Sequence, residues 1–366
     1  MKEYKNKLVI IGNGFDLAHG LPTSYGHFIK WYLVSICEKM KKSFQQYDDK
    51  LINVKLKNLS RDMHSFQMLK KDDTKIEWFF ELSKSESIFD IEYKSQYFRK
   101  LLIEIERFSW VDIESEYYKS LIKIYDDVKG SRVVGFIGTE KEYFESEVRK
   151  LNVDFEFFKN KLEEYLTTID CKTIDNKQDV NNLFSSEYII GYHKEENPKL
   201  IHYLNFNYTE TIEKYIWLQS NYELNYIHGE LNNQDNPIIF GYGDEIDKYY
   251  EEIQNLNINE FLNNFKSFGY FKTENYSNLL RFIESEPFDV EILGHSCGLS
   301  DRVLLNTIFE HDNCESIKIH YYQKSETEND FLSKTQEISR HFKDKAKMRK
   351  RIVNFKDCKP LVKFKK

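Results

Sequence analysis

Polar residues capable of chemistry gather in short turns that close apolar runs of this chain. The first such turn, Gly12-Asn13-Gly14, follows the apolar residues 8–11. At the carboxyl edge of a parallel sheet, such a turn leads into a helix whose amide groups favour phosphate, and glycines let a pyrophosphate approach the backbone. The usual dinucleotide fingerprint would require a third glycine where Leu17 stands. A tight turn without a ligand is the alternative explanation for the two glycines.

Two later turns supply a pair of asparagines and a histidine. Asn205 and Asn207 close one apolar run, and His228, followed by Gly229, closes the next. A carboxamide at such an edge can hydrogen-bond a ribose hydroxyl or a water, and a histidine can exchange a proton near neutral pH. Taken singly, the asparagines are also explained by helix capping and the histidine by a structural role. Together, polar turns at one sheet edge favour a binding site.

The fourth turn, residues 294–298 (Gly-His-Ser-Cys-Gly), matches the Gly-x-Ser-x-Gly pattern of a nucleophile elbow. A serine hydrolase would complete this elbow with Asp301 or Asp312 and with His320 or His341. The elbow of such enzymes lies in mid-sheet, whereas only one clear strand follows this turn. We therefore favour a turn that faces phosphate or ribose, with Ser300 or Asp301 capping the next helix.

Two groups of carboxylates have simpler explanations than metal binding. The carboxylates of residues 112–116 fit a solvated helix start with an acidic first turn, with Ser109 as N-cap and Asp112 in the capping-box position. The acidic residues of 244–247 fit a solvated loop better than a site for a divalent cation. No metal site is therefore predicted.

Alternating strand and helix patterns place these turns in an α/β fold with a Rossmann-like, mostly parallel sheet. Strands are predicted at residues 7–11, 200–206, 224–227, 238–240, 290–293 and 317–322, and helices at 209–219, 275–285, 301–309 and 330–342. Residues 24–197 are mostly helical in pattern, because apolar residues recur there at spacings of three and four. We predict a core of residues 1–30 and 198–341, a helical insertion of residues 31–197 and a basic tail of residues 342–366.

The composition predicts a soluble, cytoplasmic and bacterial protein. No run approaches the roughly 20 apolar residues of a membrane helix, and the short apolar segment near the N-terminus lacks the cleavage site of a signal peptide. The five cysteines contain no Cys-x-x-Cys pair, so neither a zinc knuckle nor a disulfide framework is indicated. Only two alanines among 366 residues, with abundant Lys, Asn, Ile, Tyr and Phe, indicate the codon bias of an AT-rich genome.

Charge is unevenly distributed along the chain. The net charge is −7, but residues 342–366 hold eleven Lys and Arg against two Asp, a local charge of +9 that leaves −16 for the rest. An acidic body argues against a protein that binds nucleic acid over its whole surface. We expect the basic tail to be solvated, and its contact with nucleic acid or an acidic partner is the less favoured alternative.

Taken in order, these motifs resemble the signatures of the AbiH family of phage abortive-infection proteins. Residues 11–25, Ile-Gly-Asn-Gly-Phe-Asp-Leu-Ala-His-Gly-Leu-Pro-Thr-Ser-Tyr, carry most of the resemblance. Shorter matches follow at residues 110–114 (Trp-Val-Asp-Ile-Glu), 206–209 (Phe-Asn-Tyr-Thr), 227–229 (Ile-His-Gly), 240–244 (Phe-Gly-Tyr-Gly-Asp), 294–296 (Gly-His-Ser) and 300–301 (Ser-Asp). The resemblance covers the chain from about residue 8 to about residue 322.

The motifs are more distantly similar to the sirtuin-like fold, whose turns enclose NAD. That similarity implies that Asn207 holds a water and the nicotinamide ribose and that His228 acts as a base. The residues it implies for nucleotide binding are Gly12, Asn13, Gly14, Phe15, Asp16, Tyr25, Thr209, Gly229, Gly294, His295, Ser296 and Asp301. The zinc-binding cysteine module of sirtuins is missing, so protein deacetylation is not expected.

Together these resemblances imply an antiphage effector that cleaves the nicotinamide–ribose bond of NAD, with NAD as substrate or ligand and no tightly bound cofactor. The alternative is a non-catalytic nucleotide-binding sensor that acts through a partner. Asp16 and Thr209 favour it, since a small hydroxyl residue and an aspartate are usual at their positions. A toxic activity needs restraint, so we expect a homo-oligomer, a phage-derived trigger or an operon partner, with the helical insertion as candidate regulator. Contact with a membrane is not expected.

Overall fold

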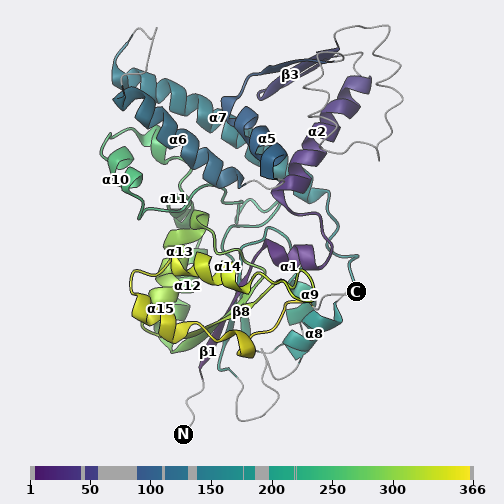
Figure 1. The fold of residues 1–366 in the computed structure, drawn as a ribbon, viewed down its shortest axis with the longest axis vertical. Coiled ribbons are helices and arrows are strands. Elements are labelled where there is room, and N and C mark those ends of the chain that lie inside the picture. Colours follow the sequence, from purple (N-terminus) through teal and green to yellow (C-terminus); the bar gives the residue numbers. More distant parts are fainter. Residues whose placement is uncertain are drawn as a thin grey trace. The chain divides into compact units, whose positions relative to one another are not determined.

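The computed structural model of the chain describes residues 5–42, 46–56, 89–108, 112–130, 138–175, 177–185, 198–217, 219 and 221–362 (Figure 1). Besides the elements introduced below, these residues form the helices α1 (Asn13–Ala18), α10 (Lys248–Gln254), α11 (Lys266–Gly269) and α14 (Phe331–Ser339) and the 3-10 turns η1 (Asn259–Leu262), η2 (Tyr270–Lys272), η3 (Leu299–Asp301) and η4 (Phe355–Asp357). No helix in the described ranges is long and apolar enough to cross a membrane.

A five-stranded parallel sheet organises the polar turns. Its strands are β1 (Asn6–Ile11), β5 (Ile201–Asn205), β6 (Tyr222–Tyr226), β7 (Phe288–Leu293) and β8 (Cys314–His320), in the spatial order β6-β5-β1-β7-β8 (Figure 1). The predicted Rossmann-like α/β fold is confirmed. The strand order reverses between β1 and β7, and such a switch point is where open α/β sheets bind ligands.

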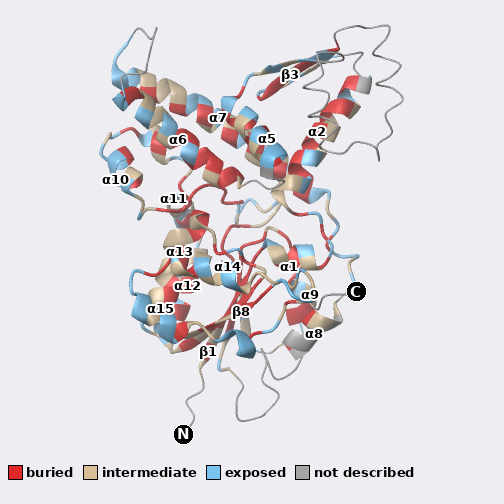
Figure 2. Cartoon of the chain, viewed as in Figure 1, coloured by how far each residue is buried: buried red, intermediate tan, exposed pale blue. Residues whose placement is uncertain are grey.

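Both faces of the sheet are buried, which explains why residues 8–11 of β1 are all apolar. Leu8 and Ile10 face one core, which contains side chains of α12 (Asn275–Ser285) and α13 (Arg302–Glu310). Val9 and Ile11 face the other core, with side chains of α8 (Gln178–Ser185) and α9 (Glu213–Ile216). Figure 2 shows the resulting band of buried residues along the strands.

The strand register brings the ends of the strands into one row. Ile11 pairs with Asn205 on one side and with Leu293 on the other, Asn205 pairs with Tyr226, and Leu293 pairs with His320. Because all strands run in the same direction, the turns that follow them leave the sheet at one edge. The predicted meeting of the polar turns at the carboxyl edge is therefore confirmed.

Two predicted elements in this part of the chain are wrong. Of the predicted helix 209–219, only α9 is helical. The Asn205 side chain accepts a hydrogen bond from the Asn207 amide and donates one to the Thr209 carbonyl, and these bonds stabilise a turn where the helix was expected to begin. The predicted strand 238–240 is buried but lies outside the sheet. Its Ile239 amide donates to the His228 carbonyl (2.7 Å) instead. The predicted helix 275–285 is confirmed as α12.

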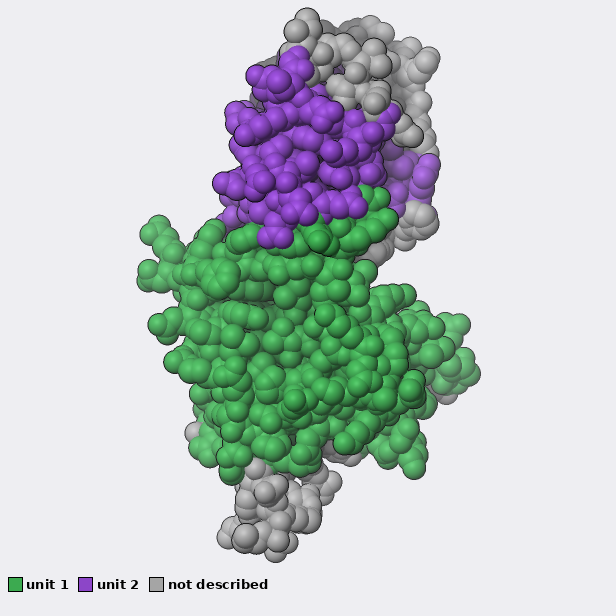
Figure 3. Space-filling model, turned by 90° about the vertical axis from the view of Figure 1, so that its left-hand side faces the viewer, with its two compact units in different colours: residues 1–23, 169–251, 264–366 green, residues 24–168, 252–263 purple. Residues whose placement is uncertain are grey.

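The chain divides into two compact units, coloured separately in Figure 3. Unit 1 (Met1–Thr23, Ile169–Glu251 and Asn264–Lys366) contains the parallel sheet. Unit 2 (Ser24–Thr168 and Glu252–Asn263) contains α2 (Tyr25–Lys42), α5 (Gln96–Phe108), α6 (Ile113–Lys129) and α7 (Glu140–Thr167). The helical character predicted for this stretch is confirmed for these four segments.

Unit 2 also contains an antiparallel sheet that was not predicted. Its strands β2 (Gln46–Asp48), β3 (Ile52–Leu56) and β4 (Phe89–Tyr93) lie in sequence order. In β3, Ile52, Val54 and Leu56 are buried and alternate with more exposed residues, the period of two that marks a strand. This alternation was the available signal, and it is too short to stand out among helical patterns.

The acidic helix start of unit 2 differs in detail from the prediction. Asp112, and not Ser109, is the N-cap of α6, where it accepts hydrogen bonds from the amides of Glu114 and Ser115. Ser109 lies outside the described residues. The side chains of Glu114 and Glu116 are buried, so the predicted solvation of this turn is wrong.

The C-terminal segment contacts β8, and the predicted solvated tail is wrong at Arg351, whereas Lys345, Arg349, Lys350, Lys356 and Lys359 are exposed as expected. This segment forms α15 (Lys345–Arg351), and the Val353 amide donates to the Ile317 carbonyl (3.0 Å). The Arg351 side chain is only 7% exposed and donates from its guanidinium group to the Phe309 carbonyl (2.6 Å). Arg351 therefore has a structural role in joining this segment to the rest of unit 1.

We predict that Arg351→Met lowers the free energy of unfolding by about 1–3 kcal/mol, because a buried carbonyl loses its donor. The matched control is Arg349→Met, since Arg349 lies in the same helix but is exposed. That control should change stability by less than about 0.5 kcal/mol. Urea denaturation of both variants measures the difference, and equal stabilities would contradict a structural role for Arg351.

Candidate functional site

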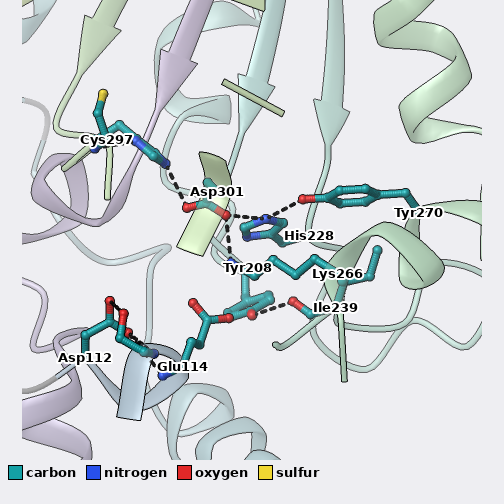
Figure 4. Close-up of polar contacts among 11 residues, drawn as sticks. Asp112, Glu114, Tyr208, His228, Ile239, Lys266, Tyr270, Cys297 and Asp301 are labelled. Atoms are coloured by element: carbon teal, nitrogen blue, oxygen red, sulfur yellow. Dashed lines mark hydrogen bonds and ion pairs between the residues drawn. The ribbon is translucent and has the colours of Figure 1, made fainter. Parts of the chain in front are cut away.

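A buried carboxylate, Asp301, lies at the centre of the candidate site. The Lys266 ammonium nitrogen is 2.7 Å from its Oδ1, and the His228 Nε2 is 3.3 Å from the same oxygen. The His295 Nε2 is 3.6 Å from the other oxygen, Oδ2. Figure 4 shows His228 and Lys266 converging on Asp301, with Tyr270 beyond the imidazole. All these side chains are buried; Asp301 is 7% exposed and Lys266 is 1% exposed.

Strand ends position the two histidines. His228 follows β6 and His295 follows β7, and the ring of Phe206, which follows β5, lies against both imidazoles at centroid distances of 5.0 and 4.2 Å. Asp301 occupies the N-cap position of α13, as predicted, but its side chain makes no capping hydrogen bond. The carboxylate is instead committed to Lys266 and the histidines.

Hydrogen bonding defines the tautomer of His295. Its Nδ1 accepts a hydrogen bond from the Cys297 amide (2.9 Å), so the ring proton of the neutral imidazole is on Nε2, facing Asp301. Burial lowers the pKa of His295 to about 3, against the opposing effect of Asp301. His295 is therefore neutral at neutral pH, with its ring N–H on the side of Asp301.

Only some of the titratable groups in the cluster are charged at neutral pH. Burial lowers the pKa of His228, the charge of Lys266 lowers it further, and Asp301 opposes both effects. Burial alone would raise the pKa of Asp301, but Lys266 and the two histidines bring it well below its usual range. The cluster thus contains an ammonium–carboxylate pair and two neutral imidazoles.

The Tyr270 hydroxyl lies 3.4 Å from the His228 Nε2 and is a further polar neighbour of this imidazole, shown in Figure 4.

Lys266 and Tyr270 were missed by the sequence interpretation. Lys266 begins α11 and is distant in the sequence from the polar turns that follow the strands. Nothing in its local sequence distinguishes it from a surface lysine. Its amide donates to the Tyr242 carbonyl (3.0 Å), and the Val303 amide donates to the Gly243 carbonyl (3.0 Å). The segment around Tyr242 therefore connects Lys266 to the helix that follows Asp301.

The acidic loop after this segment also has a structural role. Asp244 is 2% exposed, accepts a hydrogen bond from the Ile246 amide and pairs with the Arg302 guanidinium group (3.0 Å). The prediction of a solvated loop is therefore wrong at Asp244, which is buried and pairs with the partly exposed Arg302. Its partner Arg302 directly follows Asp301, so this ion pair helps to hold the start of α13.

The two glycine turns at the switch point contact each other directly. The Gly14 amide donates to the Gly294 carbonyl (2.8 Å), and Gly294 has a φ of +76°, which favours glycine. A Cβ at Gly14 would lie 2.6 Å from that carbonyl oxygen, and a Cβ at Gly12 would lie 2.4 Å from the His295 Cα. The space that these glycines leave open is filled by the neighbouring turn.

Asn207 and Asp16 lie beside the first turn. The Asn207 carboxamide donates to the Gly12 carbonyl (3.2 Å), which connects the turns after β5 and β1. The Asp16 carboxylate accepts a hydrogen bond from the Thr209 hydroxyl (2.6 Å), and Asp16, like Thr209, is buried. Burial raises the pKa of Asp16 to about 6 despite this hydrogen bond. The acidic group is thus enclosed beside Thr209.

The remaining predicted residues are more scattered. Phe15 is fully buried in the core that also contains Val9, and Gly229 adopts a φ of +83° in a turn next to Pro237. Asn13 is exposed, and its side-chain oxygen accepts a hydrogen bond from the Thr23 hydroxyl. Tyr25 belongs to unit 2 and is half-buried at the start of α2.

The arrangement does not favour the serine hydrolase alternative. Ser296 is exposed, and the residue with the positive φ expected of a nucleophile elbow is Cys297 (+56°). His320 contacts Glu291, and the His341 imidazole donates to the Cys297 carbonyl (2.7 Å). The two histidines that this alternative would use are therefore engaged elsewhere.

A metal ion is also a poor fit to the cluster. Two imidazoles and a carboxylate are donor types that transition metals take. Here, however, the ammonium group of Lys266 occupies the position of a cation beside Asp301. In the described part of the chain, no group of three His, Cys, Asp or Glu side chains could hold a metal ion.

We predict that Gly14→Ala lowers the free energy of unfolding by about 1–3 kcal/mol, because its methyl group would overlap the Gly294 backbone. Gly298→Ala is the matched control, since a Cβ there would lie 3.7 Å from its closest neighbour, the Ser296 hydroxyl. Chemical denaturation should find the control close to the wild type. Equal losses in both variants would contradict the requirement for close contact between the turns.

A second prediction concerns the pH dependence of stability. Because the pKa of Asp16 is raised from 3.8 to about 6, folding favours the protonated carboxyl group. The stabilisation of the folded state by this protonation is complete below pH 3.8 and is lost as the pH rises through 6. Between pH 5 and pH 8 the wild type should therefore lose about 1 kcal/mol of unfolding free energy relative to the neutral variant Asp16→Asn. Urea denaturation of both proteins at the two pH values measures this change. A constant difference would contradict it.

Comparison with known proteins agrees with the motif order. The family model described as bacteriophage abortive infection AbiH matches residues 8–323, which include β1 from Leu8 onward, the other four strands of the parallel sheet and the polar turns at its carboxyl edge. No curated protein matches the sequence. The family predicted from residues 11–25 and the later motifs is confirmed. This chain therefore belongs to the AbiH family of bacteriophage abortive-infection proteins and acts in antiphage defence.

Proposed function

We propose that this protein defends against phage by binding NAD at the carboxyl edge of the parallel sheet and hydrolysing its nicotinamide–ribose bond. The observation that carries the proposal is the placement of His228 against Asp301 at that edge, 3.3 Å apart. The edge lies at a reversal of strand order, where open α/β sheets bind nucleotides. The distant similarity of the motif order to the sirtuin-like fold further supports NAD as the ligand.

In this reaction the His228 imidazole is the base. The bond between the ribose C1′ and the nicotinamide nitrogen breaks, and its electron pair leaves with neutral nicotinamide. Water attacks the resulting oxocarbenium-like carbon, and the imidazole takes the water's proton, which yields ADP-ribose. The lowered pKa of His228 fits this role, because the imidazole must be unprotonated to accept the proton.

Asn207 is proposed to position the ribose or the attacking water. Its carboxamide is fixed by the Gly12 carbonyl, and a fixed polar group loses little entropy when it binds a substrate. His228, Asn207 and Asp301 are all buried, so substrate binding requires covering residues to move. A closed site suits a toxic effector whose activity a phage-derived trigger, an oligomeric state or an operon partner restrains.

The second candidate is a sensor that binds the nucleotide without cleaving it. The observation that favours it is the short contact between Lys266 and Asp301 (2.7 Å). A carboxylate already paired with an ammonium group stabilises a neighbouring imidazolium less, which weakens His228 as a base. In this alternative, nucleotide binding alone would pass a signal to a partner.

We predict that the purified protein releases nicotinamide from NAD and that His228→Ala abolishes this release. Chromatography of the reaction products measures it, in buffer and in phage-infected lysate. His311→Ala is the matched control, because His311 lies at the end of α13, outside the Asp301 cluster, and this variant should retain activity. Asn207→Ala should reduce release by about 10²-fold or more if it positions the reacting groups.

Calorimetry with NAD separates the two candidates. Binding without nicotinamide release, together with unchanged cellular NAD during infection, would contradict hydrolysis and support the sensor. Absence of binding to NAD, ADP-ribose and other adenine nucleotides would contradict both. Full protection against phage by His228→Ala and by Asn207→Ala would refute the assigned roles of these residues.

A further inference from the structure

Among the described residues, Lys266 is the one lysine that is buried. Its side chain is 1% exposed, and its ammonium nitrogen is 2.7 Å from the Asp301 Oδ1. Placing an ammonium ion inside a protein costs several kcal/mol unless a charged partner offsets the lost hydration. Such a buried cation therefore requires a counter-charge, and Asp301 supplies it.

The same carboxylate faces two imidazoles. His228 approaches Oδ1, the oxygen that Lys266 contacts, and His295 approaches Oδ2. His228 is also faced by the Tyr270 hydroxyl and the backbone of Phe206, and its charge would interact with that of His295. One buried negative charge thus has three neighbours able to carry a positive charge, and Lys266 has the shortest contact.

We propose that Lys266 is a positioning residue: its ammonium group is the permanent counterion of Asp301, a role that His228 would otherwise have to take. Without Lys266 the buried carboxylate would be stabilised by a proton on the closest imidazole, and His228 would become an imidazolium ion. An imidazolium ion cannot accept a proton from water. The effect of Lys266 on catalysis rests on the proposed function, but the charge state of His228 can be measured without NAD.

The test uses Lys266→Met, which keeps most of the side-chain volume and removes the charge. Nitrogen chemical shifts of histidine-labelled protein distinguish neutral imidazole from imidazolium, and the His228 signal is identified by its absence in His228→Gln. In the wild type, His228 should be neutral at pH 7. In Lys266→Met its titration midpoint should rise by about two pH units or more, as expected when a close opposite charge loses its competing partner.

Two further variants make the result specific. Lys266→Met combined with Asp301→Asn removes both buried charges and should return His228 to the neutral form at pH 7. Lys347→Met removes a lysine from a surface ion pair with Asp312 (2.7 Å) and should leave the His228 midpoint unchanged. If the wild type cleaves NAD, Lys266→Met should also move the pH profile of cleavage to higher pH, whereas a purely structural defect would lower activity at every pH.

An unchanged His228 midpoint in Lys266→Met would overturn the proposal. If Lys266→Met does not fold, stability decides: recovery of folding in the double variant supports the counterion role, and an equally unfolded double variant contradicts it. Failure of the wild type to cleave NAD would count against the proposed function alone, because the titration of His228 is read without substrate.

Discussion

The contact between the turns after β1 and β7 is the constraint on which the rest of the site depends. The Gly14 amide and the Gly294 carbonyl meet at 2.8 Å, and no side chain can fit between the two backbones. This contact holds His295 over the first turn and sets the start of the segment that leads to Asp301. The glycines are therefore explained by the meeting of two backbones, whatever ligand binds nearby.

Electrostatics then determine which groups of the site are charged. Burial disfavours an isolated charge, so the carboxylate of Asp301 and the ammonium group of Lys266 persist as a pair, while both neighbouring imidazoles remain neutral. Asp16 is affected by the same burial without a cation beside it, and its pKa rises instead. Two acidic residues at one sheet edge thus have pKa values shifted in opposite directions, because Asp301 has a buried lysine beside it and burial dominates at Asp16.

Membership of the AbiH family connects this protein to antiphage defence. A defence protein must be harmless until infection, and a site whose polar groups already satisfy one another is a physical form of restraint. In the proposed function, its hydrogen bonds and ion pairs would be exchanged for contacts with NAD before the nicotinamide–ribose bond is cleaved. The balance between these internal contacts and ligand binding is the property on which activation would act.

The sequence by itself determined the parallel sheet, the meeting of the polar turns at its carboxyl edge and the family. Short apolar runs and glycine turns are local patterns, readable over a few residues. The tertiary structure alone decided that Lys266 joins Asp301, that Arg351 is buried and that Gly14 meets Gly294. Each of these contacts joins residues at least 35 positions apart, and a side chain's partner across such a separation depends on packing and burial, which no local pattern records.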